Sequence, residues 1–105
     1  MSRVESLRAW LVDHPDDRFA RYSLALELKK AGELDAGFAE LHELLRRHPT
    51  SGAGHYQHGL WLLEAERPEE ARAAWEAGLA ALRDADSAEA RRSEREIRGA
   101  LADLD

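Results

Sequence analysis

The sequence contains no cysteine and no asparagine, and only three of its 105 residues are proline. Without cysteine, disulfides, thiolate metal sites and cysteine nucleophiles are all excluded. β-Branched side chains are also scarce, since only four positions carry one: Val4, Val12, Thr50 and Ile97. A β-sheet would lack the side chains that pack best on its surface, so this composition excludes a mainly β fold.

Long apolar runs and an excess of positive charge are missing as well. The densest apolar segment covers residues 60–63, far fewer than the roughly 20 residues that cross a bilayer. The formal net charge is −6, whereas nucleic-acid binding normally needs a basic face that neutralises phosphates. We therefore expect a soluble, cytoplasmic protein that binds neither nucleic acid nor a membrane. The length fits one domain over residues 1–105.

What the sequence does contain are helix-forming residues. Alanine, leucine, glutamate, arginine and lysine supply 63 of the 105 positions, and all five favour helices. The fold class is therefore predicted to be all-α, with six helices separated by prolines, glycines and short polar residues. They are expected to cover about residues 2–14, 16–31, 35–47, 50–66, 68–83 and 86–104.

Short polar residues mark where several of these helices begin. Ser2 and Glu5 have the spacing of a capping box, in which each side chain satisfies a backbone N–H of the other residue. Asp86 and Glu89 have the same spacing, so Asp86 is expected to begin the last helix. Gly32 follows the second helix, where a residue without a β-carbon commonly ends a helix.

The helices repeat with a period of 34 residues. The pair His14-Pro15 recurs as residues 48–49, and Tyr22 recurs as Tyr56. Small and large apolar residues also alternate in matching positions of the two units. The first unit has Leu24-Ala25, Leu28, Gly37, Leu41 and Pro49, and the second has Gly59, Leu62, Ala71, Trp75 and Gly78. In this period and pattern, residues 16–84 resemble the tetratricopeptide repeat family.

The resemblance implies a short right-handed α-solenoid of antiparallel helix pairs. Its parts are a half-repeat helix at 1–14, repeats at 16–49 and 50–84, and a capping helix at 86–104. In such pairs the small residues let two helices approach closely, and a large side chain fills the neighbouring space. The sequence departs from the family pattern at four positions: Arg21 and His55 replace tryptophan, His58 replaces leucine, and Arg83 replaces the closing proline.

The resemblance also implies a concave binding face, formed by the first helix of each repeat. The positions concerned are Phe19, Tyr22, Leu26, Lys29 and Lys30 in the first repeat, and Ala53, Tyr56, Leu60, Leu63 and Glu64 in the second. Tyr22 and Tyr56 would share one inner wall, with leucines beside them and lysines at the rim. Such a strip suits a bound peptide or helix. Alternatively, it is partly covered by the first or last helix, or by a second copy of the chain.

Two histidines offer the one candidate metal site. His55 and His58 lie three residues apart on one helix face, so they can give a metal two imidazole ligands. His48 or His42 can approach them, but no cysteine and no obvious carboxylate completes the set, and the structural interpretation is favoured. We expect no metal and no cofactor. We also find no catalytic motif, because serine, histidine and aspartate occur without any arrangement that sets them together.

The tryptophans are interpreted from the same family positions. All three are best interpreted as packing residues. Trp10 and Trp75 match core positions of the family, whereas Trp61 lies on a side that can also form outer surface. If exposed, Trp61 would mark a second contact site.

Three functional hypotheses follow from these patterns. The first is a non-enzymatic interaction module that binds a protein or peptide in the tyrosine-lined strip. The second is a homo-oligomeric scaffold that uses the same strip to bind a second copy of itself. The third is metal or small-ligand binding through His55 and His58.

Overall fold

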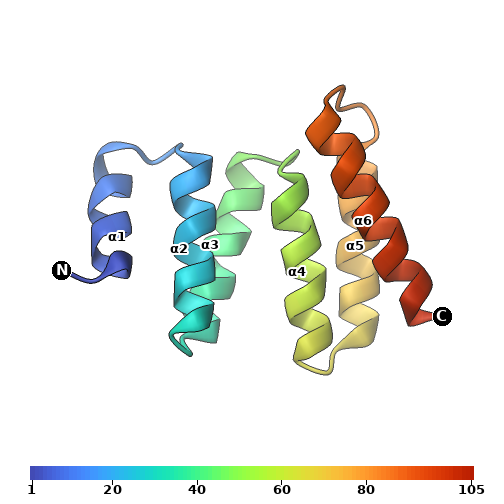
Figure 1. Ribbon diagram of the computed structural model, residues 1–105, viewed down its shortest axis with the longest axis horizontal. Coiled ribbons are helices and arrows are strands. Elements are labelled where there is room, and N and C mark those ends of the chain that lie inside the picture. Colours follow the sequence, from blue (N-terminus) through green and yellow to red (C-terminus); the bar gives the residue numbers. More distant parts are fainter. The chain divides into compact units, whose positions relative to one another are not determined.

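A computed structural model describes all residues 1–105 and contains six α-helices and no strand (Figure 1). The helices are α1 (Arg3–Asp13), α2 (Arg18–Lys30), α3 (Leu34–Arg47), α4 (Gly52–Glu64), α5 (Pro68–Leu82) and α6 (Ala88–Leu104). The predicted all-α class with six helices is confirmed. The chain forms two compact units, unit 1 over Met1–His48 and unit 2 over Pro49–Asp105. Their boundary falls one residue before the predicted end of the first repeat.

The helix ends are set by capping residues that lie close to them in the sequence. Ser2 and Glu5 form the predicted capping box, and the Ser2 hydroxyl accepts from the backbone N–H of Glu5 at 3.1 Å. Asp17 caps α2 by accepting from the N–H of Ala20 at 3.0 Å. After α2, Gly32 adopts a φ of +83°, a left-handed conformation that glycine reaches without strain.

The prediction that Asp86 begins the last helix is wrong. Ser87 is the cap, because its hydroxyl accepts from the N–H of Ala90 at 3.0 Å and α6 begins at Ala88. Serine and aspartate cap helices about equally well, so local preference alone could not separate these neighbours. The loop before Ser87 is fixed by Arg91, whose guanidinium donates to the carbonyl oxygens of Leu82 and Ala85.

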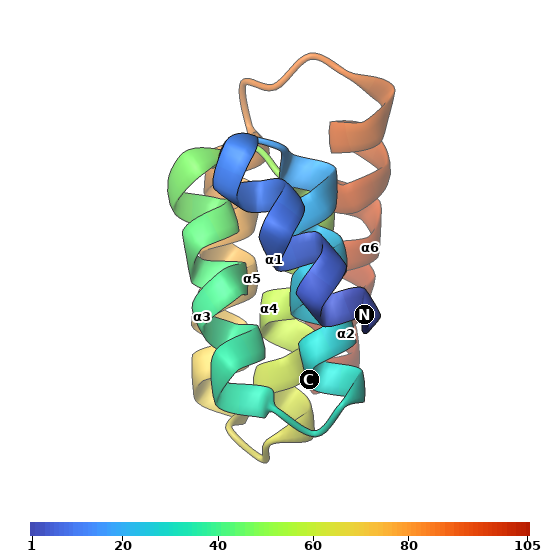
Figure 2. The same ribbon diagram turned by 90° about the vertical axis from the view of Figure 1, so that its left-hand side faces the viewer.

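In unit 1, α2 and α3 form an antiparallel pair and α1 packs beside α2 (Figure 2). The apolar core consists of Leu11, Ala20, Leu24 and Leu28, with Val4, Leu7 and Ala36 packed against it. Arg21 on α2 forms an ion pair of 2.6 Å with Glu40 on α3. This ion pair therefore links the two helices by charge.

The predicted core position of Trp10 is wrong, whereas the burial of Trp61 agrees with its interpretation as a packing residue. Trp10 is 49% exposed, whereas Trp61 is only 1% exposed. Helix α1 packs only on α2 within its unit, so one narrow face of α1 enters the core and Trp10 lies beside it. The Trp10 ring stacks on His14 and its N–H donates to Asp17. Trp61 tolerates burial because its N–H donates to the Gln57 side chain one turn earlier.

In unit 2, α4 and α5 form an antiparallel pair that is packed through glycines, as the alternation of small and large residues predicted. A β-carbon at Gly59 would lie 2.1 Å from Nε1 of Trp75, and one at Gly78 would lie 2.8 Å from Cβ of His55. Each glycine therefore accepts a ring of the facing helix directly on its backbone. Helix α6 then packs against both α4 and α5.

Candidate functional site

A groove of about 320 Å³ lies where α4, α5 and α6 meet, and we call it the α4–α6 groove. Its lining residues are Tyr56, Leu60 and Leu63 of α4, Trp75 of α5, and Glu96, Gly99, Ala100 and Asp103 of α6. The α4 residues follow one another at intervals of four and three positions, so they share one face of that helix. The groove therefore has an apolar wall on α4 and a mixed wall on α6.

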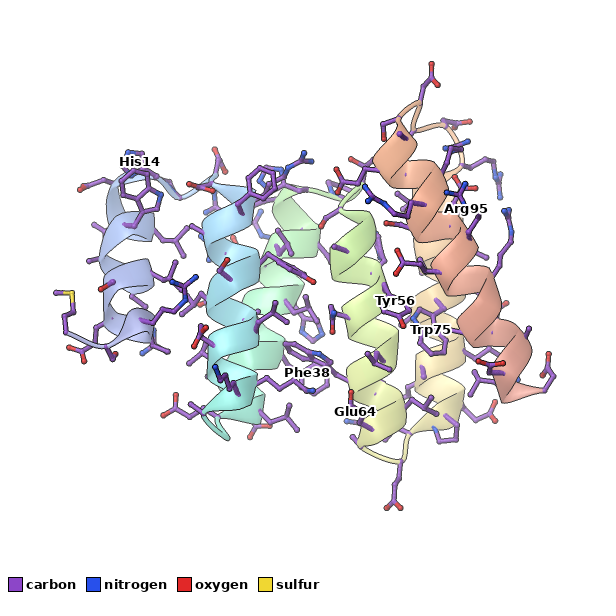
Figure 3. The ribbon with its side chains drawn as sticks, viewed as in Figure 1. His14, Phe38, Tyr56, Glu64, Trp75 and Arg95 are labelled. Carbon is purple, nitrogen blue, oxygen red and sulfur yellow. The ribbon has the colours of Figure 1, made fainter.

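The aromatic pair in this groove is held firmly. The rings of Tyr56 and Trp75 stack at a tilt of 21°, with centroids 6.5 Å apart, and both lie between α4 and α6 (Figure 3). Trp75 is 1% exposed, and its N–H donates to the carbonyl oxygen of Tyr56 at 3.1 Å. Tyr56 is half-buried and keeps part of its side chain accessible. Its surface is therefore pre-organised for contact, with little rotamer freedom left to lose on binding.

The α6 wall is set by the opposite face of that helix. Ala90, Ser93 and Ile97 are buried and fix how α6 packs. A β-carbon at Gly52 would lie 2.4 Å from Cβ of Ser93, so the start of α4 and the middle of α6 are in close contact. This packing leaves Gly99 and Ala100 facing the groove rather than the core.

The structure brings together three of the predicted binding residues of the second repeat. Tyr56, Leu60 and Leu63 line the α4–α6 groove and are half-buried. Ala53 is half-buried and Glu64 is exposed, and neither lines this groove. In unit 2, α6 packs against α4 and lines the other side of the groove that contains Tyr56, Leu60 and Leu63.

The predicted binding residues of the first repeat all lie on α2 in unit 1. Tyr22, Leu26 and Lys29 are half-buried, whereas Phe19 and Lys30 are exposed. The proposed shared wall of Tyr22 and Tyr56 concerns two different units and stays a prediction.

The α6 wall of the groove was not predicted from the sequence, which indicated only a capping helix over residues 86–104. The wall consists of Glu96, Gly99, Ala100 and Asp103, whose spacing of three, four and seven residues marks one helix face. The available signal was Gly99, a helix-interior glycine with no turn to make.

His55 is used in packing. It is 9% exposed, lies against Gly78, and its Nε2 is 2.7 Å from the carbonyl oxygen of Pro49, to which it donates. Burial, the main cause, lowers the pKa of His55 below its ordinary value. His58 is half-buried, and no group of three or more histidine, aspartate or glutamate side chains is placed to hold a metal ion.

We expect unit 2 to lose stability as the pH falls below about 6.5, the ordinary pKa of a histidine. Because the pKa of His55 is lowered in the folded chain, the unfolded chain binds a proton first. The stabilising effect is therefore complete above pH 6.5 and is lost as the pH falls toward the folded pKa. Urea unfolding at about pH 7.5 and about pH 5.5 measures this loss.

The matched control is His55→Gln, whose amide can donate to the Pro49 carbonyl without becoming charged. In this variant the free energy of unfolding should lose most of its pH dependence between about pH 5.5 and about pH 7.5. The pKa of Asp17 is lowered by hydrogen bonds from Ala20 and Trp10, and that of Glu43 is lowered to about 2 by Arg46 and Arg47; both carboxylates lose their stabilising contributions only below about pH 4.5 and do not interfere. An unchanged pH dependence in His55→Gln would contradict the assignment.

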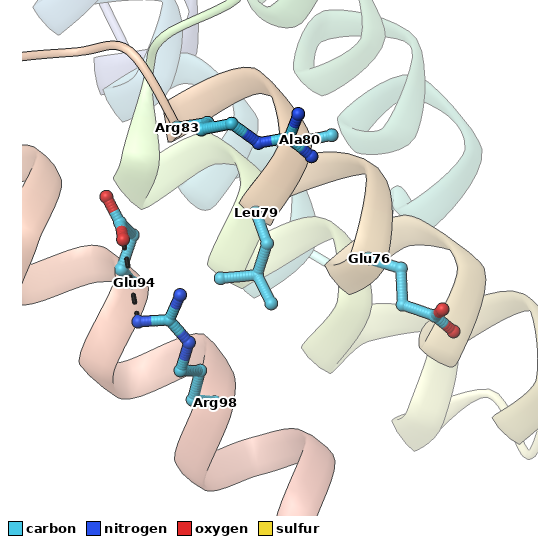
Figure 4. A pocket seen from close by; sticks show the side chains of 6 residues that line it. All are labelled: Glu76, Leu79, Ala80, Arg83, Glu94 and Arg98. Carbon is cyan, nitrogen blue, oxygen red and sulfur yellow. Dashed lines mark ion pairs between the residues drawn. The ribbon is translucent and has the colours of Figure 1, made fainter.

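A second pocket, of about 330 Å³, lies between α5 and α6 (Figure 4). It is lined by Glu76, Leu79, Ala80, Arg83, Glu94 and Arg98. The Glu94 side chain is 10% exposed; its Oε1 atom lies 2.7 Å from Arg91 without a hydrogen-bond angle, and its Oε2 atom lies 3.5 Å from Arg98. Charges of both signs already meet here within the chain, so this pocket offers no clear preference for an outside ligand.

The chain was compared with known proteins at three levels. No family model, no curated protein and no solved structure matches it. None of its helices is both long enough and apolar enough to cross a membrane.

Proposed function

We propose that this chain is a tetratricopeptide-like interaction module, without enzymatic activity, that holds a peptide or a helix in the α4–α6 groove. The observation that carries the proposal is the half-buried apolar wall of Tyr56, Leu60 and Leu63, which remains accessible although α6 packs beside it. A volume of about 320 Å³ lies at the lower end of the range for binding sites. The 34-residue period and the glycine-mediated packing support the family assignment.

Binding would draw its free energy from covering this wall. Leu60 and Leu63 supply apolar area, and Tyr56 adds a large surface with few rotamers. The ring is already held by its stack on Trp75. An apolar side chain of the partner would fill the groove and exclude water from all three residues.

The test uses a synthetic helical peptide of about 18 residues, or five turns, with leucine on one face and glutamine elsewhere. In ¹H–¹⁵N NMR spectra, we expect saturable shifts at Leu60, Leu63 and Ala100. The double variant Tyr56→Ala with Leu60→Ala should weaken binding at least tenfold, since both side chains leave the wall. Helicity measured by circular dichroism should stay close to the parent value.

The control is Leu45→Ala, a similar loss of half-buried apolar area on α3 in unit 1, at a position outside the predicted binding strip. It should leave the peptide affinity unchanged. Equal binding by the parent and by the double variant would contradict the proposal. Light scattering at several concentrations measures self-association, and association that the double variant abolishes would instead support the homo-oligomeric scaffold.

A further inference from the structure

The charged side chains that line the α4–α6 groove are both acidic. Glu96 and Asp103 lie on α6, and no lysine or arginine is among the lining residues. Neither carboxylate forms an ion pair or a hydrogen bond within the chain. By contrast, Glu94 and Asp105 on the same segment are paired with arginines. The groove therefore presents two uncompensated negative charges beside an apolar wall.

Gly99 lies between these carboxylates, three residues after Glu96 and four before Asp103. It is inside α6, where glycine costs about 1 kcal/mol relative to alanine. No positive φ and no packing contact requires it, because a β-carbon there would have nothing within 4 Å. This glycine differs from Gly52, Gly59 and Gly78, each of which has a side chain of the chain itself against its backbone. At Gly99 the corresponding space is empty and belongs to the groove.

Resting on the proposed function, we infer that the partner of the α4–α6 groove is a basic amphipathic helix. Its apolar side chains enter the groove over Gly99, and two lysine or arginine residues flank them and pair with Glu96 and Asp103. Complementary charge favours this occupant over an acidic segment, which would place like charges together.

The spacing of the carboxylates defines the partner further. Seven residues of α-helix separate Glu96 from Asp103, which corresponds to about 10 Å along the axis. Two basic residues seven positions apart on a partner helix match this separation. The partner residues three and four positions after the first of them then face Gly99. Arg92 and Arg95 are nearer the start of α6 and do not line the groove, and Figure 3 shows Arg95 apart from Tyr56 and Trp75.

The experiment compares three helical peptides that share the same leucine face and carry lysine, glutamine or glutamate elsewhere. Fluorescence anisotropy with the full chain at about 0.15 M salt measures each affinity. We expect the lysine peptide to bind at least tenfold more tightly than the glutamate peptide, with the glutamine peptide between them. The double variant Glu96→Gln with Asp103→Asn should weaken binding of the lysine peptide about five- to tenfold.

The net charge of −6 attracts any basic peptide, so a control of equal charge is needed. Asp84→Asn with Asp86→Asn removes two exposed carboxylates from the loop before α6, outside the groove. It should change the affinity for the lysine peptide less than twofold. If both double variants weaken binding equally, the attraction is non-specific and the inference is overturned.

Gly99 supplies a second, independent readout. Gly99→Leu adds a side chain into the empty space and should abolish binding of the lysine peptide, whereas Gly99→Ala should retain most of it. If the glutamine and lysine peptides bind equally, the inference fails and the proposed function stands. If none of the three peptides binds, or if Gly99→Leu binds normally, the groove itself is not the site and both proposals fail.

Discussion

Replacing Gly59 with alanine should lower the free energy of unfolding of unit 2 by about 2–3 kcal/mol, because overpacking a buried contact costs this much. The new methyl group would lie 2.1–2.4 Å from three atoms of the Trp75 indole. The ring is 1% exposed, and its N–H is bonded to the Tyr56 carbonyl, so it cannot move aside freely. The thermal midpoint should fall by roughly 10 °C or more. Urea unfolding and hydrogen exchange of α4 and α5 measure the loss.

The control is the same substitution at Gly99. Its β-carbon enters empty space, so only the gain in helix propensity remains, and stability should rise by up to about 1 kcal/mol. Both glycines are inside helices of unit 2. The opposite signs of the two changes in unfolding free energy therefore separate the effect of the Trp75 contact from the general effect of replacing a helical glycine. Similar effects at the two positions would contradict the packing described for α4 and α5.

The helices could be predicted from the sequence because their signals are local. Caps such as Ser2 and Asp17, the proline at the start of α5 and Gly32 after α2 act within one turn of their own position. The exchange of small and large residues between α4 and α5 was also predictable, since Gly59 and Trp75 occupy complementary positions in a repeating pattern. These features need no knowledge of distant contacts.

The environment of single side chains was harder to predict. Trp10 was expected in the core, yet α1 packs mainly on α2 in its unit, so about half of the indole stays exposed. The face of α4 that carries Trp61 was compatible with packing or with outer surface, and the side chain is buried. Burial depends on how many elements surround a residue, whereas periodicity reports only the face on which it lies.

The candidate site was half predictable for the same reason. Tyr56, Leu60 and Leu63 form one apolar face of α4 and were identified from the repeat. Their opposite wall depends on which face α6 turns toward α4, and that is decided by the packing of its other side. The sequence of α6 contains charged residues of both signs. Only the structure shows that two of the acidic ones, Glu96 and Asp103, line the groove.

The contact between Gly52 and Ser93 decides that placement, and its disruption is the second large effect expected. In Gly52→Ala the new β-carbon would lie 2.2 Å from Oγ and 2.4 Å from Cβ of Ser93, which is 4% exposed. Because α4 and α6 approach closely at this contact, α6 must shift away from α4. We expect the free energy of unfolding to fall by about 2 kcal/mol. The lysine peptide should also bind at least tenfold more weakly, because α6 supplies one wall of the groove.

Compensation by Ser93→Gly tests whether this contact is the cause. Glycine at position 93 removes both atoms that the new methyl group meets, at a cost of up to about 1 kcal/mol for a glycine inside a helix. The double variant should therefore be more stable than Gly52→Ala alone, with a coupling free energy of about 1–2 kcal/mol, and should recover most of the peptide affinity. Additive losses would show that Gly52 and Ser93 do not touch. The α6 wall, and with it the pairing of Glu96 and Asp103 with a basic helix, would then lack its structural basis.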